Sequence, residues 1–225
     1  MIKAGIIGGS GYTGGELIRI LLNHPATEID FVYSTTRAGK RVTTAHPDLL
    51  GVTDLEFTGN VNLNVDVVFL CLGHGNSTAF LKEHDFSSDT KIIDLSNDFR
   101  LHKDADFDGK KFIYGLPELF KKEIENAQYI ANPGCFATAI QLALLPLAKA
   151  NLLENEVHIN AVTGSTGAGV SPSATSHFSW RNNNVSWYKP FTHQHLGEIN
   201  ESIHSLQENS GNLFFMPNRG NFTRG

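Results

Sequence analysis

The chain begins with the apolar run Ile2-Lys3-Ala4-Gly5-Ile6-Ile7 and continues directly into Gly8-Gly9-Ser10-Gly11-Tyr12-Thr13-Gly14. The apolar run predicts a buried strand, and the residues Gly14–Asn23 predict a helix with Leu17, Ile18, Leu21 and Leu22 on one face. The glycines at positions 9, 11 and 14 have the spacing of the turn that joins strand to helix in a dinucleotide-binding unit. In that turn the first glycine permits the bend, the second admits a pyrophosphate, and the third lets helix and strand pack closely. The stretch predicts cofactor contacts from Gly9, Ser10, Gly11, Tyr12, Thr13 and Gly14.

Strand-like and helix-like segments alternate over the first two-thirds of the chain, as in a doubly wound parallel sheet. The expected strands after the first are Glu28–Tyr33, Val65–Leu72, Lys91–Leu95 and Tyr129–Ala131, and Ser77–Glu83 is an expected helix. The pattern changes near Val157, where we expect strands at Val157–Gly164 and Leu213–Met216, a helix at Glu198–Gln207, and few helical signals over 171–192. The sequence therefore predicts a Rossmann-type α/β domain over residues 1–134, followed by an α+β catalytic and dimerisation domain over 135–225.

The composition is that of an ordinary globular protein, with 40% hydrophobic and 18% charged residues among 225. A formal charge of −5 argues against nucleic acid or an anionic membrane as the main partner, and no apolar run is long enough to span a bilayer. Two cysteines do not make a disulfide framework, and no cysteine or histidine pair has metal-ligand spacing. We expect a cytoplasmic protein without a metal.

The end of the second expected strand carries hydroxyls and cations, in the run Ser34-Thr35-Thr36-Arg37-Ala38-Gly39-Lys40-Arg41. An NAD site would have an acidic residue there to bind the ribose hydroxyls, whereas hydroxyls and an arginine suit a 2′-phosphate. Ser34 and Arg37 therefore favour NADP over NAD, unless the basic residues are only a solvated loop. Small residues after the buried strand, including Gly73 and Ser77, are expected beside the nicotinamide half. Cys71, within that strand, is expected to be an inert core thiol.

The second cysteine lies in Asn132-Pro133-Gly134-Cys135-Phe136, directly before helix-forming residues. A thiolate at a helix N-terminus is stabilised by the helix dipole and can attack an acyl group. Such a thiol needs a proton partner, and the run His193-Gln194-His195-Leu196-Gly197-Glu198 offers two histidines that share one face of an extended segment. We expect His195, with His193 as the alternative, to serve Cys135. A cysteine that merely caps a helix is the competing interpretation.

An acyl-phosphate substrate with a carboxylate would be anionic at both ends. Backbone N–H groups of a glycine-rich turn bind oxyanions, and arginine binds carboxylate or phosphate with two parallel hydrogen bonds. The expected substrate-binding residues are Ser165, Thr166, Gly167, Arg181, Glu198 and Arg219. An ordinary loop with surface arginines is the alternative for each residue taken singly.

Several longer blocks resemble the N-acetyl-γ-glutamyl-phosphate reductases, a family of arginine-biosynthesis enzymes, and occur in the family's order from residue 2 to the last residue. The most specific are Asp94-Leu95-Ser96-Asn97-Asp98-Phe99-Arg100 and Tyr114-Gly115-Leu116-Pro117-Glu118, and they are joined by Leu72-Gly73-His74-Gly75, Asn132-Pro133-Gly134-Cys135, Gly164-Ser165-Thr166-Gly167-Ala168-Gly169 and His193-Gln194-His195-Leu196-Gly197-Glu198. The aspartate-semialdehyde dehydrogenases are similar in architecture and in their cysteine but fit these blocks less well.

The resemblance implies that Cys135 attacks the acyl phosphate, expels phosphate and forms a thioester, which NADPH reduces to N-acetyl-glutamate 5-semialdehyde. His195, with or without His193, would act as acid and base, and the second domain would build a homo-oligomer. Family members continue beyond this chain's last residue, so we expect the second domain to lack a C-terminal part. Related acyl phosphates (aspartyl, N-succinyl-glutamyl or carrier-linked aminoadipyl) and a non-catalytic NADP-binding module remain as alternatives.

Overall fold

The computed structural model describes residues 1–224, which divide into two compact units between Asn132 and Pro133. The first unit contains β1 (Ile2–Ile7), α1 (Tyr12–Leu22), β2 (Thr27–Tyr33), β3 (Phe57–Thr58), β4 (Val67–Leu70), α2 (Ser77–Glu83), β5 (Lys91–Asp94), β6 (Asp106–Phe107), β7 (Lys110–Tyr114), α3 (Pro117–Asn126) and β8 (Tyr129–Ala131). The second contains α4 (Cys135–Lys149), β9 (Val157–Thr163), α5 (Phe178–Arg181), β10 (Ser186–Trp187), α6 (His195–His204) and β11 (Leu213–Arg219).

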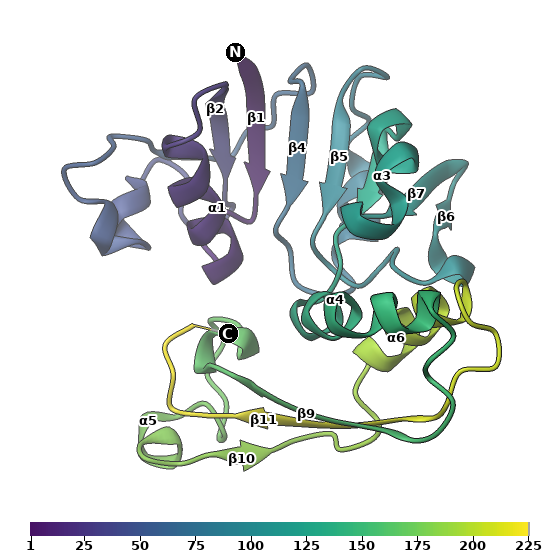
Figure 1. The fold of residues 1–225 in the computed structure, drawn as a ribbon. Coiled ribbons are helices and arrows are strands. Elements are labelled where there is room, and N and C mark those ends of the chain that lie inside the picture. The colour runs from purple at the N-terminus through teal and green to yellow at the C-terminus, as the bar shows by residue number, and fades with distance from the viewer. Residues whose placement is uncertain (225) are drawn as a thin grey trace. The chain divides into compact units, whose positions relative to one another are not determined.

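The first unit is built on one sheet with the strand order β3-β2-β1-β4-β5-β8-β7-β6 (Figure 1). All neighbouring strands are parallel except β6 and β7, which form an antiparallel hairpin at one edge. The order 3-2-1-4-5 is that of the dinucleotide-binding Rossmann fold, with its ligand site beyond the carboxyl ends of the strands. The predicted fold class is confirmed.

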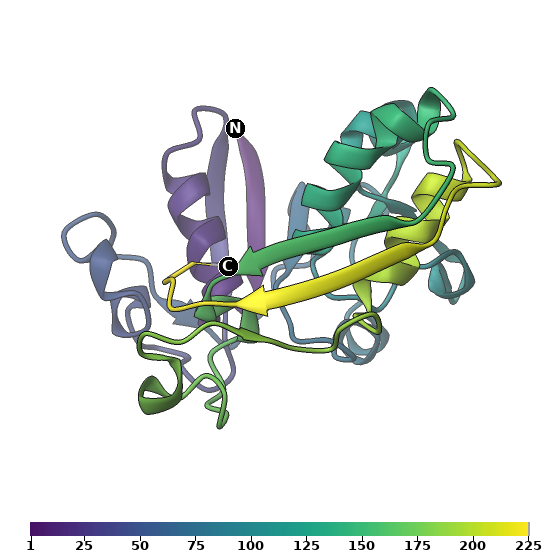
Figure 2. The ribbon, with the colours of Figure 1, turned by 60° about the horizontal axis from the view of Figure 1, so that its bottom comes forward.

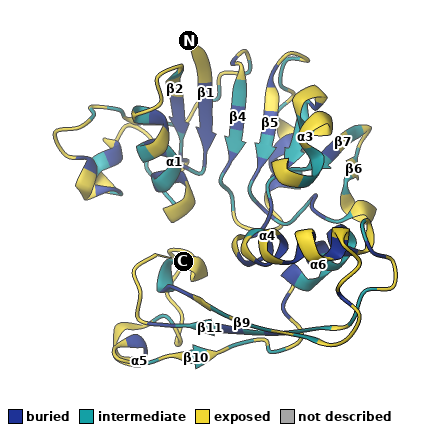
Figure 3. Ribbon diagram, in the orientation of Figure 1, coloured by how far each residue is buried: buried dark blue, intermediate teal, exposed yellow. Residues whose placement is uncertain are grey.

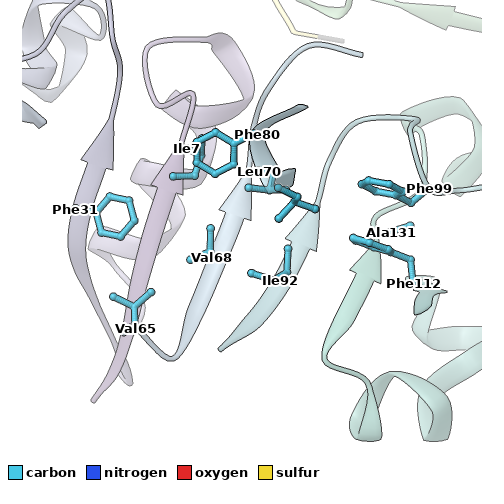
Figure 4. Close-up of a cluster of buried hydrophobic side chains, with 11 residues drawn as sticks. Ile7, Phe31, Val65, Val68, Leu70, Phe80, Ile92, Phe99, Phe112 and Ala131 are labelled. Atoms are coloured by element: carbon cyan, nitrogen blue, oxygen red, sulfur yellow. The ribbon is translucent and has the colours of Figure 1, made fainter. Parts of the chain in front are cut away.

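Both faces of this sheet are buried, because successive side chains of a strand point to opposite faces. Ile6 packs with Ile18 and Leu21 of α1 on one face. Ile7 packs on the other face with Val68, Leu70, Phe80 and Ile92, in the cluster drawn in Figure 4. Figure 3 shows β1 largely buried and β4 and β5 partly buried, beside exposed outer surfaces of α1 and α3. The near-continuous apolar runs in the sequence follow from this double burial.

The second unit combines a three-stranded sheet with two helices, α4 and α6, that pack against each other. The sheet order is β10-β11-β9; β9 and β11 run parallel over seven residue pairs (Figure 2), and β10 is antiparallel to β11. Phe215, fully buried on β11, contacts the ring of Phe136 on α4. Residues of the sheet that share a face with Phe215 are therefore directed toward the first turn of α4.

Most predicted elements are present, with shifts of a few residues at their ends. β4 is shorter than the predicted Val65–Leu72, and α6 begins at His195 rather than Glu198. β11 continues to Arg219, past the predicted end at Met216, although Pro217 lies inside a central strand, where proline is rare. The hairpin β6–β7 and α3 were not predicted; α3 is amphipathic, but none of its residues is fully buried.

Candidate active site

The glycine-rich turn lies between β1 and α1, at the carboxyl end of the central strand. The left-handed backbone conformation falls at Gly8, with a φ of 79°, rather than at the predicted Gly9. A β-carbon on Gly14 would lie 2.6 Å from the Gly9 α-carbon, so only glycine lets α1 begin this close to the turn. The turn therefore has the backbone approach that a pyrophosphate at the start of a helix requires.

The predicted cofactor residues Ser10 and Ser34 are brought together across the turn. Their hydroxyl oxygens lie 3.2 Å apart, and Thr36 adds a third hydroxyl 3.5 Å from that of Ser34. Arg37 lies on the same segment, half-buried, and donates one hydrogen bond to the carbonyl of Thr44. These groups are the hydroxyls and cation that a ribose phosphate would contact, which fits NADP.

His46 is a residue of this site that the sequence analysis missed. Its buried imidazole is hydrogen-bonded through Nε2 to the carbonyl of Gly9 at 2.8 Å. The ring also fills the space beside Gly15, where a β-carbon would lie 2.4 Å from its Cε1. His46 therefore supports the glycine-rich turn from behind. No pattern in the sequence marks this histidine, since it is far from the turn along the chain.

Two aspartates hold the loop that follows β4 against the loop that follows β5. Buried Asp94 accepts hydrogen bonds from the hydroxyls of Ser77 at 2.5 Å and Ser96 at 2.6 Å. Asp98 accepts from the backbone N–H groups of Gly75 and Thr78. Burial raises the pKa of Asp94, while its two serine partners oppose that change.

This arrangement corrects the prediction for Ser77. The residue is fully buried and its hydroxyl is directed to Asp94, so its side chain anchors the loop instead of facing a cofactor. Gly73 is exposed, as a residue beside a nicotinamide must be.

Cys135 is the first residue of α4, with Gly134 as the N-cap, and its side chain is exposed to solvent. The thiol thus lies at a helix N-terminus, as predicted from the sequence. Cys71 is different, because burial and then the nearby Asp94 raise the pKa of its thiol to about 12. Of the two thiols, only that of Cys135 lies in an environment suited to a nucleophile.

His195 lies directly against the backbone that precedes Cys135. A β-carbon on Gly134 would lie 2.3 Å from Nε2 of the buried His195 ring. Buried Glu198 accepts a hydrogen bond from the Gly134 N–H at 3.1 Å, and its other carboxylate oxygen lies 3.9 Å from His195 Nε2. The first turn of α6 is therefore fastened to the residue next to the thiol. Glu198, predicted as a substrate ligand, instead positions the histidine and the turn.

His193 is buried beside His195, with their ring centres 4.5 Å apart. Its Nδ1 accepts a hydrogen bond from the His195 N–H, so the ring is neutral with its proton on Nε2. Burial lowers the pKa of His193 to about 4, and the charges of Lys189 and Arg219 add to this effect. His193 therefore holds the start of α6 as an uncharged group.

Arg181 is not a substrate ligand, contrary to the prediction. The buried guanidinium uses all five of its N–H groups on the carbonyls of Thr175, Asn184 and Arg219 and on the Ser186 hydroxyl. It folds the 171–192 segment onto the end of β11 and has no donor left for a ligand.

Arg219, by contrast, lies with its guanidinium carbon 4.4 Å from the ring centre of Tyr188. Tyr188 was not predicted; its ring also contacts that of His193, with ring centres 5.6 Å apart. The predicted turn Ser165, Thr166 and Gly167 follows β9 as a short 3₁₀ segment and is half-buried to exposed. Cys135, His195, His193, Tyr188 and Arg219 thus belong to one unit and surround one end of its sheet.

Three further features were sought among the described residues: a metal site, a membrane-spanning helix and a cavity at the predicted site. No group of three or more histidine, cysteine, aspartate or glutamate side chains within 1–224 is arranged to hold a metal. Across the same residues, no helix is both long and apolar enough to cross a membrane. A shallow cavity of about 560 Å³ is lined by Pro172, Ser173, Ala174, His177, Ser179 and Trp180, and so includes none of the predicted site residues.

A dinucleotide fold in one unit and a thiol beside a fixed histidine in the other define the class of the semialdehyde dehydrogenases. Residues 3–127 match the family described as "Semialdehyde dehydrogenase, NAD binding domain". Residues 135–225 match "Semialdehyde dehydrogenase, dimerisation domain".

Relatives with high sequence identity show which family within this class the chain belongs to. The chain is 70% identical over its whole length to the N-acetyl-gamma-glutamyl-phosphate reductase of Flavobacterium johnsoniae, of which it covers 70%. The corresponding proteins of Christiangramia forsetii and Bacteroides thetaiotaomicron are 60% and 57% identical, and the chain covers 69% of each. The chain belongs to the N-acetyl-gamma-glutamyl-phosphate reductase family of oxidoreductases, which confirms the resemblance found in its sequence blocks.

Solved structures support the fold at lower identity. The aspartate semialdehyde dehydrogenase of Candida albicans, solved with NADP, superposes with a TM-score of 0.67 at 16% identity, over 98% of this chain and 68% of that one. The Vibrio cholerae aspartate semialdehyde dehydrogenase II gives 0.65 at 17% identity, over 98% of this chain and 70% of that one.

Proposed function

We propose that this protein reduces N-acetyl-γ-glutamyl phosphate to N-acetyl-glutamate 5-semialdehyde with NADPH, in arginine biosynthesis, through a thioester on Cys135. The observation that carries the proposal is the fastening of His195 and Glu198 to Gly134, directly beside an exposed thiol at a helix N-terminus. The names of the relatives supply the substrate.

In the proposed reaction the Cys135 thiolate attacks the acyl carbon, and the bond to the phosphate oxygen breaks to release inorganic phosphate. NADPH, when bound, supplies a hydride to the carbonyl carbon. His195 accepts the thiol proton before attack and donates a proton to the oxygen that becomes anionic during reduction. As the carbon–sulfur bond breaks, that oxygen returns its proton to His195, which releases the aldehyde and restores the thiolate.

The cofactor contacts remain those predicted, except for the side chain of Ser77. The backbone of Gly9, Ser10, Gly11, Tyr12, Thr13 and Gly14 would hold the pyrophosphate, with Gly73 near the nicotinamide. Ser34 and Arg37 would bind the 2′-phosphate, because hydroxyls and a guanidinium suit a dianion better than ribose hydroxyls. This choice of NADP rests on the hydroxyl cluster at the end of β2.

On the substrate side, Ser165, Thr166 and Gly167 would bind the phosphate and Arg219 the opposite end. The match of the second unit to a dimerisation domain supports a homo-oligomer. The two free cysteines suit the reducing cytoplasm, which we propose as the location.

The test is the reverse reaction. NADP⁺, N-acetyl-glutamate 5-semialdehyde and inorganic phosphate are mixed with the protein, and NADPH formation is followed by its absorbance. We expect formation that depends on phosphate and is abolished by iodoacetamide or by Cys135→Ser, while Cys71→Ser stays active. Comparable rates with the N-succinyl or aspartyl semialdehyde would refute the acetylated substrate. Turnover in Cys135→Ser would refute the thioester.

A further inference from the structure

Thr163 and Arg219 are register partners at the carboxyl ends of the parallel strands β9 and β11. Partners in neighbouring strands direct their side chains to the same face. On β11 this face also carries Phe215 and Pro217, both buried, since residues two apart share a face. Phe215 contacts the rings of Phe136 and His193, so the face is the one that approaches the Cys135 end of α4.

Both residues have a polar atom that the described structure does not satisfy. Thr163 is 7% exposed, and its hydroxyl has no hydrogen-bond partner among the residues described. The buried Nε of Arg219 likewise has none within residues 1–224. Buried polar groups left unsatisfied are rare and costly in folded proteins, so two adjacent ones need an explanation.

The surroundings of Arg219 are cationic and aromatic. Its guanidinium lies over the Tyr188 ring, and none of the ion pairs found among the described residues involves it. The neighbouring Arg181 donates all of its N–H groups to carbonyls and a hydroxyl of the chain. The guanidinium of Arg219 contacts and hydrogen-bonds Tyr188 but has no anionic partner among the described residues, so its charge can attract an anion.

Tyr188 lies near both Arg219 and the thiol of Cys135. Burial raises the pKa of its phenol, Arg219 lowers it, and Cys135 is close enough to raise it further. A ligand held at Thr163 and Arg219 is thus close to Tyr188, whose phenol lies within electrostatic range of Cys135.

We propose that Thr163 and Arg219 form the subsite that binds the α-carboxylate of the acyl substrate. This inference rests on the proposed function for the identity of the substrate. An Nε–H edge of arginine with one hydroxyl supplies the few directed donors that a planar, singly charged carboxylate accepts. A phosphate, with more charge and more oxygens, suits the following glycine-rich turn better, apart from the Ser165 N–H, which donates to the Phe222 carbonyl. Thr163 is then a specificity-determining residue that the sequence analysis did not single out.

The experiment measures protection of Cys135 from iodoacetamide, followed by mass spectrometry of the Cys135 peptide, and needs no turnover. The first probe is N-acetyl-L-norvaline, which keeps the acetamido group, the carboxylate and the carbon chain but has no aldehyde and no phosphate. Its neutral amide, N-acetyl-L-norvalinamide, and inorganic phosphate are the comparison probes. The proteins are wild type, Thr163→Val, which keeps the shape without the hydroxyl, and Thr163→Ser, which keeps the hydroxyl.

We expect N-acetyl-L-norvaline to protect wild type and Thr163→Ser at similar concentrations, and Thr163→Val only at about 10-fold higher concentration or more, the order for a lost hydrogen bond to a charged group. The amide should protect none of them, and protection by phosphate should not change. Equal protection of Thr163→Val and wild type, equal protection by the amide, or a loss confined to phosphate would each overturn the proposal.

The reverse reaction distinguishes a failure of the carboxylate subsite from a failure of the proposed reaction. With active wild type, Thr163→Val should raise the KM for the semialdehyde about 10-fold and leave the KM for phosphate unchanged. A purely structural role would change both or neither, and would overturn the inference while the function stands. An inactive wild type that N-acetyl-L-norvaline still protects would refute the proposed reaction and leave the carboxylate subsite supported.

Discussion

At the scale of single residues, Gly134 fixes the position of the His195 ring, because the ring packs directly against the Gly134 α-carbon. The His195 ring occupies the space that any side chain at position 134 would need. Gly134→Ala should therefore displace the imidazole and lower kcat/KM by at least ~10²-fold, the order for losing a general acid–base group. The added methyl should also cost about 1–3 kcal/mol of stability, as overpacking does. Activity and thermal unfolding are measured beside Gly59→Ala, whose β-carbon meets nothing closer than 3.5 Å.

A double variant tests whether the clash with His195 causes the loss of stability in Gly134→Ala. Gly134→Ala combined with His195→Ala removes the clash but not the loss of the imidazole. It should recover thermal stability relative to Gly134→Ala without recovering activity. A Gly134→Ala protein with normal turnover would mean that His195 does not need its position against Gly134.

Arg37 is a second single residue with a testable role, which is to select NADPH over NADH. Among the described residues its guanidinium donates one hydrogen bond, to the Thr44 carbonyl, which leaves other donors for a phosphate. Arg37→Ala should weaken NADPH binding about 10-fold and leave NADH binding unchanged, because only NADPH carries the 2′-phosphate. Titration of cofactor fluorescence measures both. Equal losses for the two cofactors would remove the argument for NADP from this residue.

At the scale of elements, Asp98 joins the loop before α2 to the loop after β5. It accepts the N–H groups of Gly75 and Thr78, so it orders the segment expected beside the nicotinamide. In Asp98→Ala the cofactor must order that segment itself, and we expect about 10-fold weaker NADPH binding, or about 1.4 kcal/mol. The rate of Cys135 alkylation should not change. Asp89→Ala, at an exposed position, is the matched control, and a similar loss there would contradict the role of Asp98.

The start of α6 should make the second unit sensitive to acid. His193 has a pKa of about 4 in the folded chain against an ordinary value of 6.5, so the unfolded chain binds the proton first. The stabilisation is complete above pH 6.5 and is lost progressively as the pH falls from 6.5 to 4, and it amounts to about 3 kcal/mol. Urea unfolding between these pH values should show this slope, and His193→Gln should flatten it. Both tryptophans, Trp180 and Trp187, lie in the second unit, so their fluorescence reports on it.

The elements also show how far the sequence could lead. β1, α1 and β8 were predictable because their own apolar patterns match buried strands and an amphipathic helix, whichever elements cover them. The opposite fates of Arg181 and Arg219 were not, because both are arginines in polar surroundings and only the folded chain shows which donors are used. His46 and Thr163 were missed for the same reason: each acts through contacts with residues that are distant in the sequence or through a strand register.

At the scale of the whole molecule, the two units divide the work. The first presents a turn with the backbone and hydroxyls for a dinucleotide, and the second presents a thiol, a histidine and an anion-binding corner. The hydrogen bonds of Gly134 with Glu198 and of His46 with Gly9 each lie within a single unit. We therefore expect NADPH binding and Cys135 reactivity to respond separately to mutations in the first and second units.

The outer face of the second sheet carries the last prediction, which concerns assembly. Trp187 on β10 pairs with Asn218, and Asn218 pairs with Val162, so the three share the face opposite to Phe215 and Arg219. Trp187 and Val162 are 62% and 55% exposed in the single chain, which suits a surface covered by a second copy. Because this unit matches a dimerisation domain, Trp187→Glu should place a charge in that interface and shift the protein toward monomers in analytical ultracentrifugation.

Trp180→Glu is the matched control, since Trp180 is similarly exposed, at 51%, but lies on α5 outside this sheet. It should leave the oligomeric state unchanged. Dissociation by both variants would show only that a new charge destabilises the unit. A wild-type chain that sediments as a monomer at all concentrations would refute the homo-oligomer for this polypeptide, while the thiol site, built within one chain, would still be expected to react with iodoacetamide.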